Sequence, residues 1–149
     1  MKKLIFIPIG FIPLVIGLLH RLLLALVFTD GRFPHIVPGI FTLLVWMYVG
    51  LITQKLWNSV LGTTILACLP AFAALLLVLF QELINGSYWT NAVGVLTKTF
   101  FLSLSEWISR ISFVVFANTA VVHVVSFLLL FVFFLFGAVL GHRKPKREA

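Results

Sequence analysis

Long apolar runs separated by short polar segments make up most of the chain. A helix rises about 1.5 Å per residue, so about 20 apolar residues cross the hydrocarbon core of a bilayer, which is about 30 Å thick. Four runs reach or approach that length: residues 4–28, 36–53, 59–80 and 120–141. The pattern predicts an all-α integral membrane protein, with a single membrane domain built as a four-helix transmembrane bundle.

The first run follows a pair of lysines, a start that is also typical of a secretion signal. The best cleavage candidate, Ala25-Leu26-Val27, has Val where a small residue is required. We therefore interpret residues 4–28 as an uncleaved first span. Pro8 and Pro13 are expected to kink this span, because each removes a backbone hydrogen-bond donor.

Residues 81–110, between the third and fourth runs, are more polar and predict an outer loop. Within this loop, apolar residues recur at helical spacing opposite a polar face that contains Ser103, Glu106 and Arg110. The pattern is typical of an amphipathic helix that lies in the membrane interface, just before the last span. A fifth span at this place would bury Glu106 at a high cost in free energy, so the prediction remains four spans.

Basic residues are distributed unevenly between the two sides that four spans define. One side carries Lys2, Lys3, Lys55, Arg143, Lys144, Lys146 and Arg147, and the other carries Arg32, Lys98 and Arg110. Cytoplasmic loops carry the excess of Lys and Arg in membrane proteins. Both termini, including the basic tail 142–149, are therefore predicted on the cytoplasmic side of the cell membrane (the plasma or inner membrane).

Composition changes this picture little. Hydrophobic residues make up 62% of the chain and charged residues 10%, whereas a soluble domain has about 25% charged residues. A soluble fold of this size could not cover so much apolar surface, so the lipid bilayer is the expected surrounding. The net charge of +7 comes from residues at the chain ends and between runs, without a basic stripe interleaved with aromatic residues. We therefore expect no nucleic-acid partner.

Catalytic templates are absent from the sequence. Its four acidic residues, Asp30, Glu82, Glu106 and Glu148, are scattered, and there is no HExxH, GxSxG, Walker or dinucleotide-binding motif. Cys68 is the only cysteine, so no thiolate metal site or disulfide framework is indicated. The sequence favours a non-enzymatic protein.

Arg21 lies inside the first apolar run, and an ionisable residue within the membrane is a functional candidate. Its side chain could extend to the interface, or it could pair with Glu82 or Glu106, which are predicted on the same outer side. Trp46 and Tyr48 are further candidates, because their polar groups lie mid-span and need a partner or a cavity. Simple packing within the bundle is the competing interpretation of both residues.

His20 and His123 lie in the first and last runs, at depths that could match. Two facing imidazoles in a bundle can ligate a haem, with Arg21 near a propionate. His35 would be an alternative ligand near the same surface. Single histidines in spans more often bond a neighbouring helix, so both interpretations stay open.

Small residues on two spans suggest close helix contacts. Ala67, Ala71 and Ala74 share one face of the third run, and Gly137 to Gly141 form a GxxxG motif. Our leading hypothesis is a non-enzymatic accessory, assembly or regulatory subunit of a larger complex, with a membrane-protein partner or a second copy of the chain. The alternatives are a small haem-binding redox anchor using His20 and His123, and a small transporter or transporter subunit with a site near Arg21.

Overall fold

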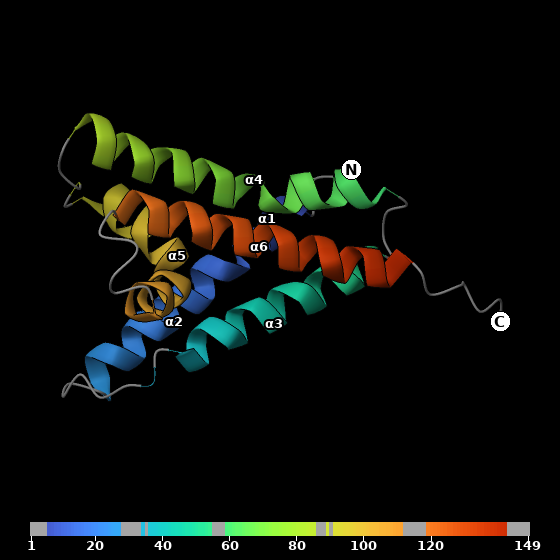
Figure 1. Cartoon of the computed structure of the whole chain (residues 1–149), viewed down its shortest axis with the longest axis horizontal. Coiled ribbons are helices and arrows are strands. Elements are labelled where there is room, and N and C mark those ends of the chain that lie inside the picture. Colours follow the sequence, from blue (N-terminus) through green and yellow to red (C-terminus); the bar gives the residue numbers. More distant parts are fainter. Residues whose placement is uncertain are drawn as a thin grey trace.

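The computed structural model describes residues 6–27, 34, 36–54, 59–85, 89, 91–111 and 119–142. Nearly all of these residues are helical, and none of them forms a strand (Figure 1). Four helical stretches are long and apolar enough to cross a membrane: Ile7–Leu26, Ile36–Thr53, Val60–Ile84 and Thr119–His142. The prediction of an all-helical chain with four such helices is confirmed.

The first span is broken near its start. Helix α1 (Phe6–Ile9) ends at a turn through Gly10, and helix α2 (Ile12–Leu26) begins directly afterwards with Pro13 in its first turn. Proline has no backbone N–H, so an uninterrupted helix would lose a hydrogen bond at this point. Gly10 lies against the Ala67 carbonyl oxygen, and a Cβ there would come within 2.6 Å of it. The break therefore lets α1 and the turn pack closely on the third span.

Helix α3 (Ile36–Thr53) and helix α6 (Thr119–His142) pack together at glycines. A Cβ on Gly50 would overlap the Phe134 carbonyl oxygen, and a Cβ on Gly137 would overlap the Met47 carbonyl oxygen. Gly141 lies in the same way against the end of α3. Close backbone approach increases the van der Waals contact that holds membrane helices together. The predicted GxxxG motif is therefore part of a contact inside the chain.

Helix α4 (Val60–Leu79) begins at Ser59, whose side chain accepts a hydrogen bond of 3.1 Å from the Gly62 amide. This N-cap satisfies one of the free amides of the first turn. The predicted small-residue face is buried, because Ala67 and Ala71 are fully covered by the rest of the chain. The helix continues into a π-helical turn, η3 (Phe80–Ile84).

Helix α5 (Ala92–Ile111) forms where the amphipathic pattern lies, and it contacts α2, α3, α4 and α6. In Figure 1, α3 and α4 diverge towards the left of the view, and α5 lies between them. Its apolar side is buried in the bundle through Phe100, Phe101, Leu104 and Ile108. The polar side differs from the expected one, since Ser103 is buried and shares a hydrogen bond of 2.9 Å with Thr42 of α3. The location of α5 in a membrane interface stays a prediction.

The end of α3, the start of α4 and the end of α6 lie together at one end of the bundle (Figure 1). Gly141 of α6 packs against Leu51 and Gln54 at the end of α3. The last residues of α2, the first of α3 and η3 lie towards the opposite end, where α5 is inserted.

Candidate functional site

A cavity of about 500 Å³ lies between α2 and α5, next to the point where the two helices touch. Its described lining is Arg21, Leu24, Trp89, Gly94, Val95, Lys98, Thr99 and Leu102. Two of these residues are cations, one from each helix, and none of the described lining residues is acidic. The volume falls within the range of about 300–1,000 Å³ that is usual for ligand pockets.

The packing of α2 places Arg21 at the rim of the cavity. Pro13, Gly17 and His20 form the buried face of α2, and Gly17 lies directly against the Thr99 carbonyl oxygen of α5. Arg21 is the next residue after His20 and lies about one turn beyond Gly17, so it projects from the edge of this contact. Its side chain is exposed. The cavity opens to the surroundings of the protein at this edge.

The α5 residues that line the cavity come from one face of that helix. Asn91 caps the helix, since its side-chain oxygen accepts a hydrogen bond of 3.0 Å from the Gly94 amide. Val95 follows Gly94 directly, and Lys98 and Leu102 follow at intervals that keep them on the same side. A positive charge is thus placed between two apolar residues, one turn before it and one turn after it.

Trp89 covers one end of the cavity and is fixed by Gln81. The amide of Trp89 donates a 3.0 Å hydrogen bond to the side-chain oxygen of Gln81, which is fully buried in η3. The side-chain nitrogen of Gln81 donates to the Leu77 carbonyl oxygen at 3.0 Å. Gly94 is needed here, because a Cβ at this position would overlap the Trp89 carbonyl oxygen. These contacts hold Trp89 against the end of α4 and the start of α5.

The electrostatics of the cavity favour an anion. Burial lowers the pKa of Lys98 below its usual value because it disfavours the charged form, and the carboxylate of Glu82 partly opposes this effect. Arg21 places a second cationic group, a guanidinium, on the same cavity. Two cations that line one cavity repel each other, so an anion between them would stabilise both.

A smaller polar pocket of about 170 Å³ lies on another side of α5. Its described lining is Ser105, Glu106, Ser109, Thr119, Val122 and His123. Nδ1 of His123 is 2.9 Å from the Thr119 carbonyl oxygen and 4.0 Å from Oε2 of Glu82. A carbonyl oxygen only accepts, so Nδ1 carries the hydrogen in the Thr119 contact. No group of three metal-ligating side chains occurs among the described residues.

Glu82 and Glu106, the partners that the sequence suggested for Arg21, are not among the described lining residues of its cavity. Glu106 and His123 line the smaller pocket, and Glu82 is beside His123, whereas the cavity of Arg21 is lined by Lys98. Lys98 was not singled out from the sequence as a site residue. No feature of the sequence singles it out, because a lysine on the polar face of an amphipathic helix is ordinary.

His20 and His123 are both buried, in α2 and α6. Among the described contacts, α2 meets α5 at Thr99, and the His123 ring meets α5 at Phe101 with 5.9 Å between ring centroids. Residues two apart on a helix point about 200° away from each other, so these contacts lie on different sides of α5. This arrangement lends the haem hypothesis no support, and the hypothesis stays a prediction. His35 lies outside the described residues.

The two mid-span aromatic candidates differ in environment. Trp46 is completely buried and packs against Phe134, with 5.0 Å between ring centroids. Tyr48 is exposed on the outer surface of α3. Neither residue lines the α2–α5 cavity.

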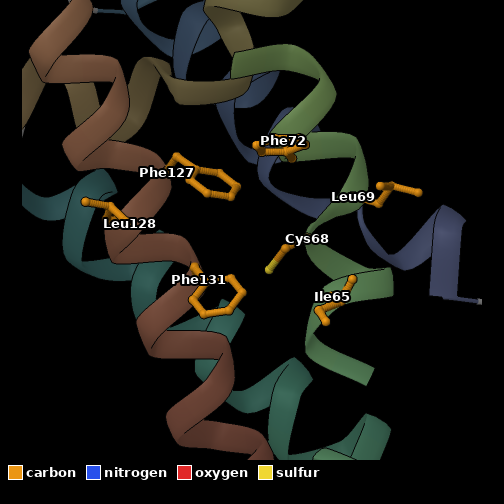
Figure 2. Close-up of a pocket in the computed structure, with 7 residues that line it drawn as sticks. All are labelled: Ile65, Cys68, Leu69, Phe72, Phe127, Leu128 and Phe131. Carbon is orange, nitrogen blue, oxygen red and sulfur yellow. The ribbon is translucent and has the colours of Figure 1, made fainter. Parts of the chain in front are cut away.

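An apolar groove of about 320 Å³ lies between α4 and α6 (Figure 2). Figure 2 shows Cys68 of α4 pointing towards α6, with Phe127 and Phe131 opposite and Phe72 above it in the view. All of its described lining residues are apolar or cysteine: Ile65, Cys68, Leu69, Phe72, Phe127, Leu128 and Phe131. The groove has no charge to orient a polar ligand, so the α2–α5 cavity is the better functional candidate.

Comparison of the chain with known protein families, curated proteins and solved structures found no match.

Proposed function

We propose that this chain is a small multi-pass membrane protein that binds an anionic ligand between α2 and α5 and acts as a transporter or a transporter subunit. The observation that carries the proposal is the pair Arg21 and Lys98, which line one cavity from two helices. Arg21 lies within an apolar segment, where a charge is costly and is usually kept for a ligand or a partner. The two cationic groups therefore offer an anion a contact from each side of the cavity.

We further propose that the end of the bundle at which α3, α4 and α6 meet faces the cytoplasm. Gln54, the last described residue before the polar link, and the end of α6, which precedes the basic tail, both lie at this end. These segments hold Lys55 and most of the C-terminal positive charge, and the excess of Lys and Arg is cytoplasmic in membrane proteins. Under this orientation the α2–α5 cavity lies in the outer half of the membrane. A C-terminal reporter that is active only in the cytoplasm should therefore be active.

Anion binding is tested on the purified protein in a neutral detergent. Either inorganic phosphate or phosphatidylglycerol should raise the melting temperature of the wild type, because a ligand that binds only the folded state stabilises it. Arg21→Gln should remove most of this rise while leaving the ligand-free melting temperature nearly unchanged, since Arg21 is exposed. An equal rise in the wild type and in Arg21→Gln would contradict the proposal.

Transport is tested separately in liposomes of neutral lipid. Arg21→Ala should abolish flux of the bound anion while leaving membrane insertion intact. Unchanged flux in this variant would exclude a transport site at Arg21. Arg110→Ala is a matched control, because Arg110 is an exposed arginine on α5 that does not line the cavity.

A role as accessory subunit is the second candidate. The small-residue faces that suggested it from the sequence are engaged within the chain, at Ala67 and at Gly137. What favours it now is the apolar groove between α4 and α6, which could receive a helix of a partner membrane protein. A photo-crosslinking residue at Leu128, an exposed position on the groove, should then capture one discrete protein in intact membranes. Capture of lipid alone would argue against this role.

A further inference from the structure

We infer that the ligand of the α2–α5 cavity is a membrane lipid with an anionic phosphate headgroup, which enters sideways from the bilayer. This inference rests on the proposed function, because it concerns the identity of the anion held by Arg21 and Lys98. It goes further by assigning the apolar part of the same cavity to the lipid chains.

The cavity combines two kinds of chemistry. Arg21 and Lys98 provide the charge, while Leu24, Val95 and Leu102 provide apolar walls on both helices. A small inorganic anion has no use for apolar walls, since burying it among them removes its hydration without replacement. An amphiphile satisfies both parts, because its phosphate contacts the cations and its chains cover the leucines and valine.

The open edge of the cavity is continuous with a lipid-facing surface. Leu18 and Leu22 lie one turn before and one residue after Arg21, and both are exposed. Of the four candidate spans, the one that contains α2 is the least covered by the rest of the described chain. A lipid can therefore approach Arg21 along α2 without leaving the membrane.

The depth of Arg21 also suits a headgroup phosphate. Arg21 lies five residues before Leu26, the last residue of α2, which is about 7 Å along the helix axis. Headgroup and interfacial layers occupy about 5–8 Å on each side of the hydrocarbon core, by the difference between core and total bilayer thickness. A long arginine side chain reaches this layer from slightly below. Its guanidinium can then bind two phosphate oxygens at once.

The experiment uses native mass spectrometry of the delipidated full-length protein in a neutral detergent. Three probes are added in separate arms: dioleoylphosphatidylglycerol, which has both charge and chains; inorganic phosphate, which has charge alone; and dioleoylglycerol, which has chains alone. We expect a tight complex with one phosphatidylglycerol and at most weak complexes with the other two probes.

Two groups of variants separate the headgroup contacts from the wall contacts. Arg21→Gln and Lys98→Gln should each lower phosphatidylglycerol affinity about tenfold, because each removes a hydrogen bond to a charged group. The matched control Arg110→Gln should leave it unchanged. Leu102→Trp should lower phosphatidylglycerol affinity, because the larger side chain occupies space in the cavity. If Leu102→Trp does not fold, Leu24→Asn repeats the test on the other helix, because it replaces an apolar part of the lining with a polar group.

Three outcomes would overturn the inference in distinguishable ways. If inorganic phosphate binds as tightly as phosphatidylglycerol, with the same dependence on Arg21 and Lys98, the lipid assignment fails and the proposed function stands. If dioleoylglycerol binds as tightly as phosphatidylglycerol, the headgroup is not recognised and the assignment to an anionic lipid fails. If neither anionic probe binds in a manner that depends on Arg21 or Lys98, the proposed function fails as well.

Discussion

The α3–α6 and α2–α5 interfaces both contain glycines that allow a close backbone contact, but they differ in how often this contact is repeated. In both, a glycine lets one helix touch a carbonyl oxygen of the other, at Gly137 and at Gly17. Along α3 and α6 the contact is repeated at Gly50 and Gly141, so the two helices stay close where both approach their last residues. Along α2 and α5 the described glycine contact occurs once, at Gly17, and a cavity opens one turn later.

The difference separates a structural interface from a candidate binding surface. Repeated small residues allow continuous van der Waals contact, which is the main attraction between helices in lipid. A single small residue fixes the position of two helices and leaves their remaining length free to diverge. Arg21 and Lys98 lie in that divergent part, where a side chain can meet a ligand.

The largest effect is expected at the α3–α6 interface. Gly137→Ala places a Cβ against the Met47 carbonyl oxygen, and a backbone atom cannot move aside as a flexible side chain can. We expect a loss of about 3 kcal/mol in unfolding free energy, at the upper end for overpacking. Denaturation in mixed micelles measures it. A control in the same helix is Val132→Ala, because the Val132 side chain is exposed and its truncation should change the unfolding free energy by no more than about 0.5 kcal/mol.

A smaller loss is expected at the interface that opens. Gly17→Ala meets the Thr99 carbonyl oxygen in the same way, but α2 is the least covered span and can shift outwards. We expect about 1–2 kcal/mol by the same denaturation assay, together with weaker phosphatidylglycerol binding because Arg21 moves with α2. A loss as large as that of Gly137→Ala would mean that the two interfaces are equally rigid.

The third prediction concerns the charge within the open region. Since the pKa of Lys98 is lowered, the lysine loses its proton at a lower pH than usual, and the cavity then loses one positive charge. Binding of phosphatidylglycerol, whose phosphodiester stays anionic, should weaken a few-fold as pH rises from about 7 to about 10. Lys98→Arg should flatten this profile, because the guanidinium stays protonated. An unchanged pH profile in Lys98→Arg would remove Lys98 from the binding step.

The smallest effect is expected at the hydrogen bond between α3 and α5. Thr42→Val and Ser103→Ala each remove one partner of the 2.9 Å contact. Hydrogen bonds between membrane helices average about 0.6 kcal/mol in double-mutant cycles, and we expect a coupling of that size. A coupling near zero would show that Gly39, which packs against Trp107 and Ser103, holds these helices together through packing alone.

Length and hydropathy alone predict the number of helices that can span a membrane. Each span is a local property, because a run of about 20 apolar residues is favourable in lipid whatever its neighbours are. The break between α1 and α2 is local too, because it follows from the missing N–H of Pro13. The amphipathic pattern likewise predicts that a helix forms over most of residues 92–111.

Only one of the two cations of the candidate site could be predicted from the sequence. Arg21 stands out because a charge inside an apolar run is costly wherever the helix packs. Lys98 does not stand out, because a lysine in a polar, amphipathic segment is ordinary. Its role depends on α5 lying against α2, a contact between residues far apart in the chain.

The small-residue motifs also show which features the sequence determines and which depend on the tertiary structure. The sequence determined that Ala67, Ala71, Gly137 and Gly141 offer smooth helix faces, because the absence of bulky side chains is a local fact. Only the tertiary structure decided that these faces are used within the chain, and that the cations of two helices share one cavity. The physical reason is that lipid specifies which segments are buried in the membrane, whereas the choice of neighbour depends on the shapes of all the helices together.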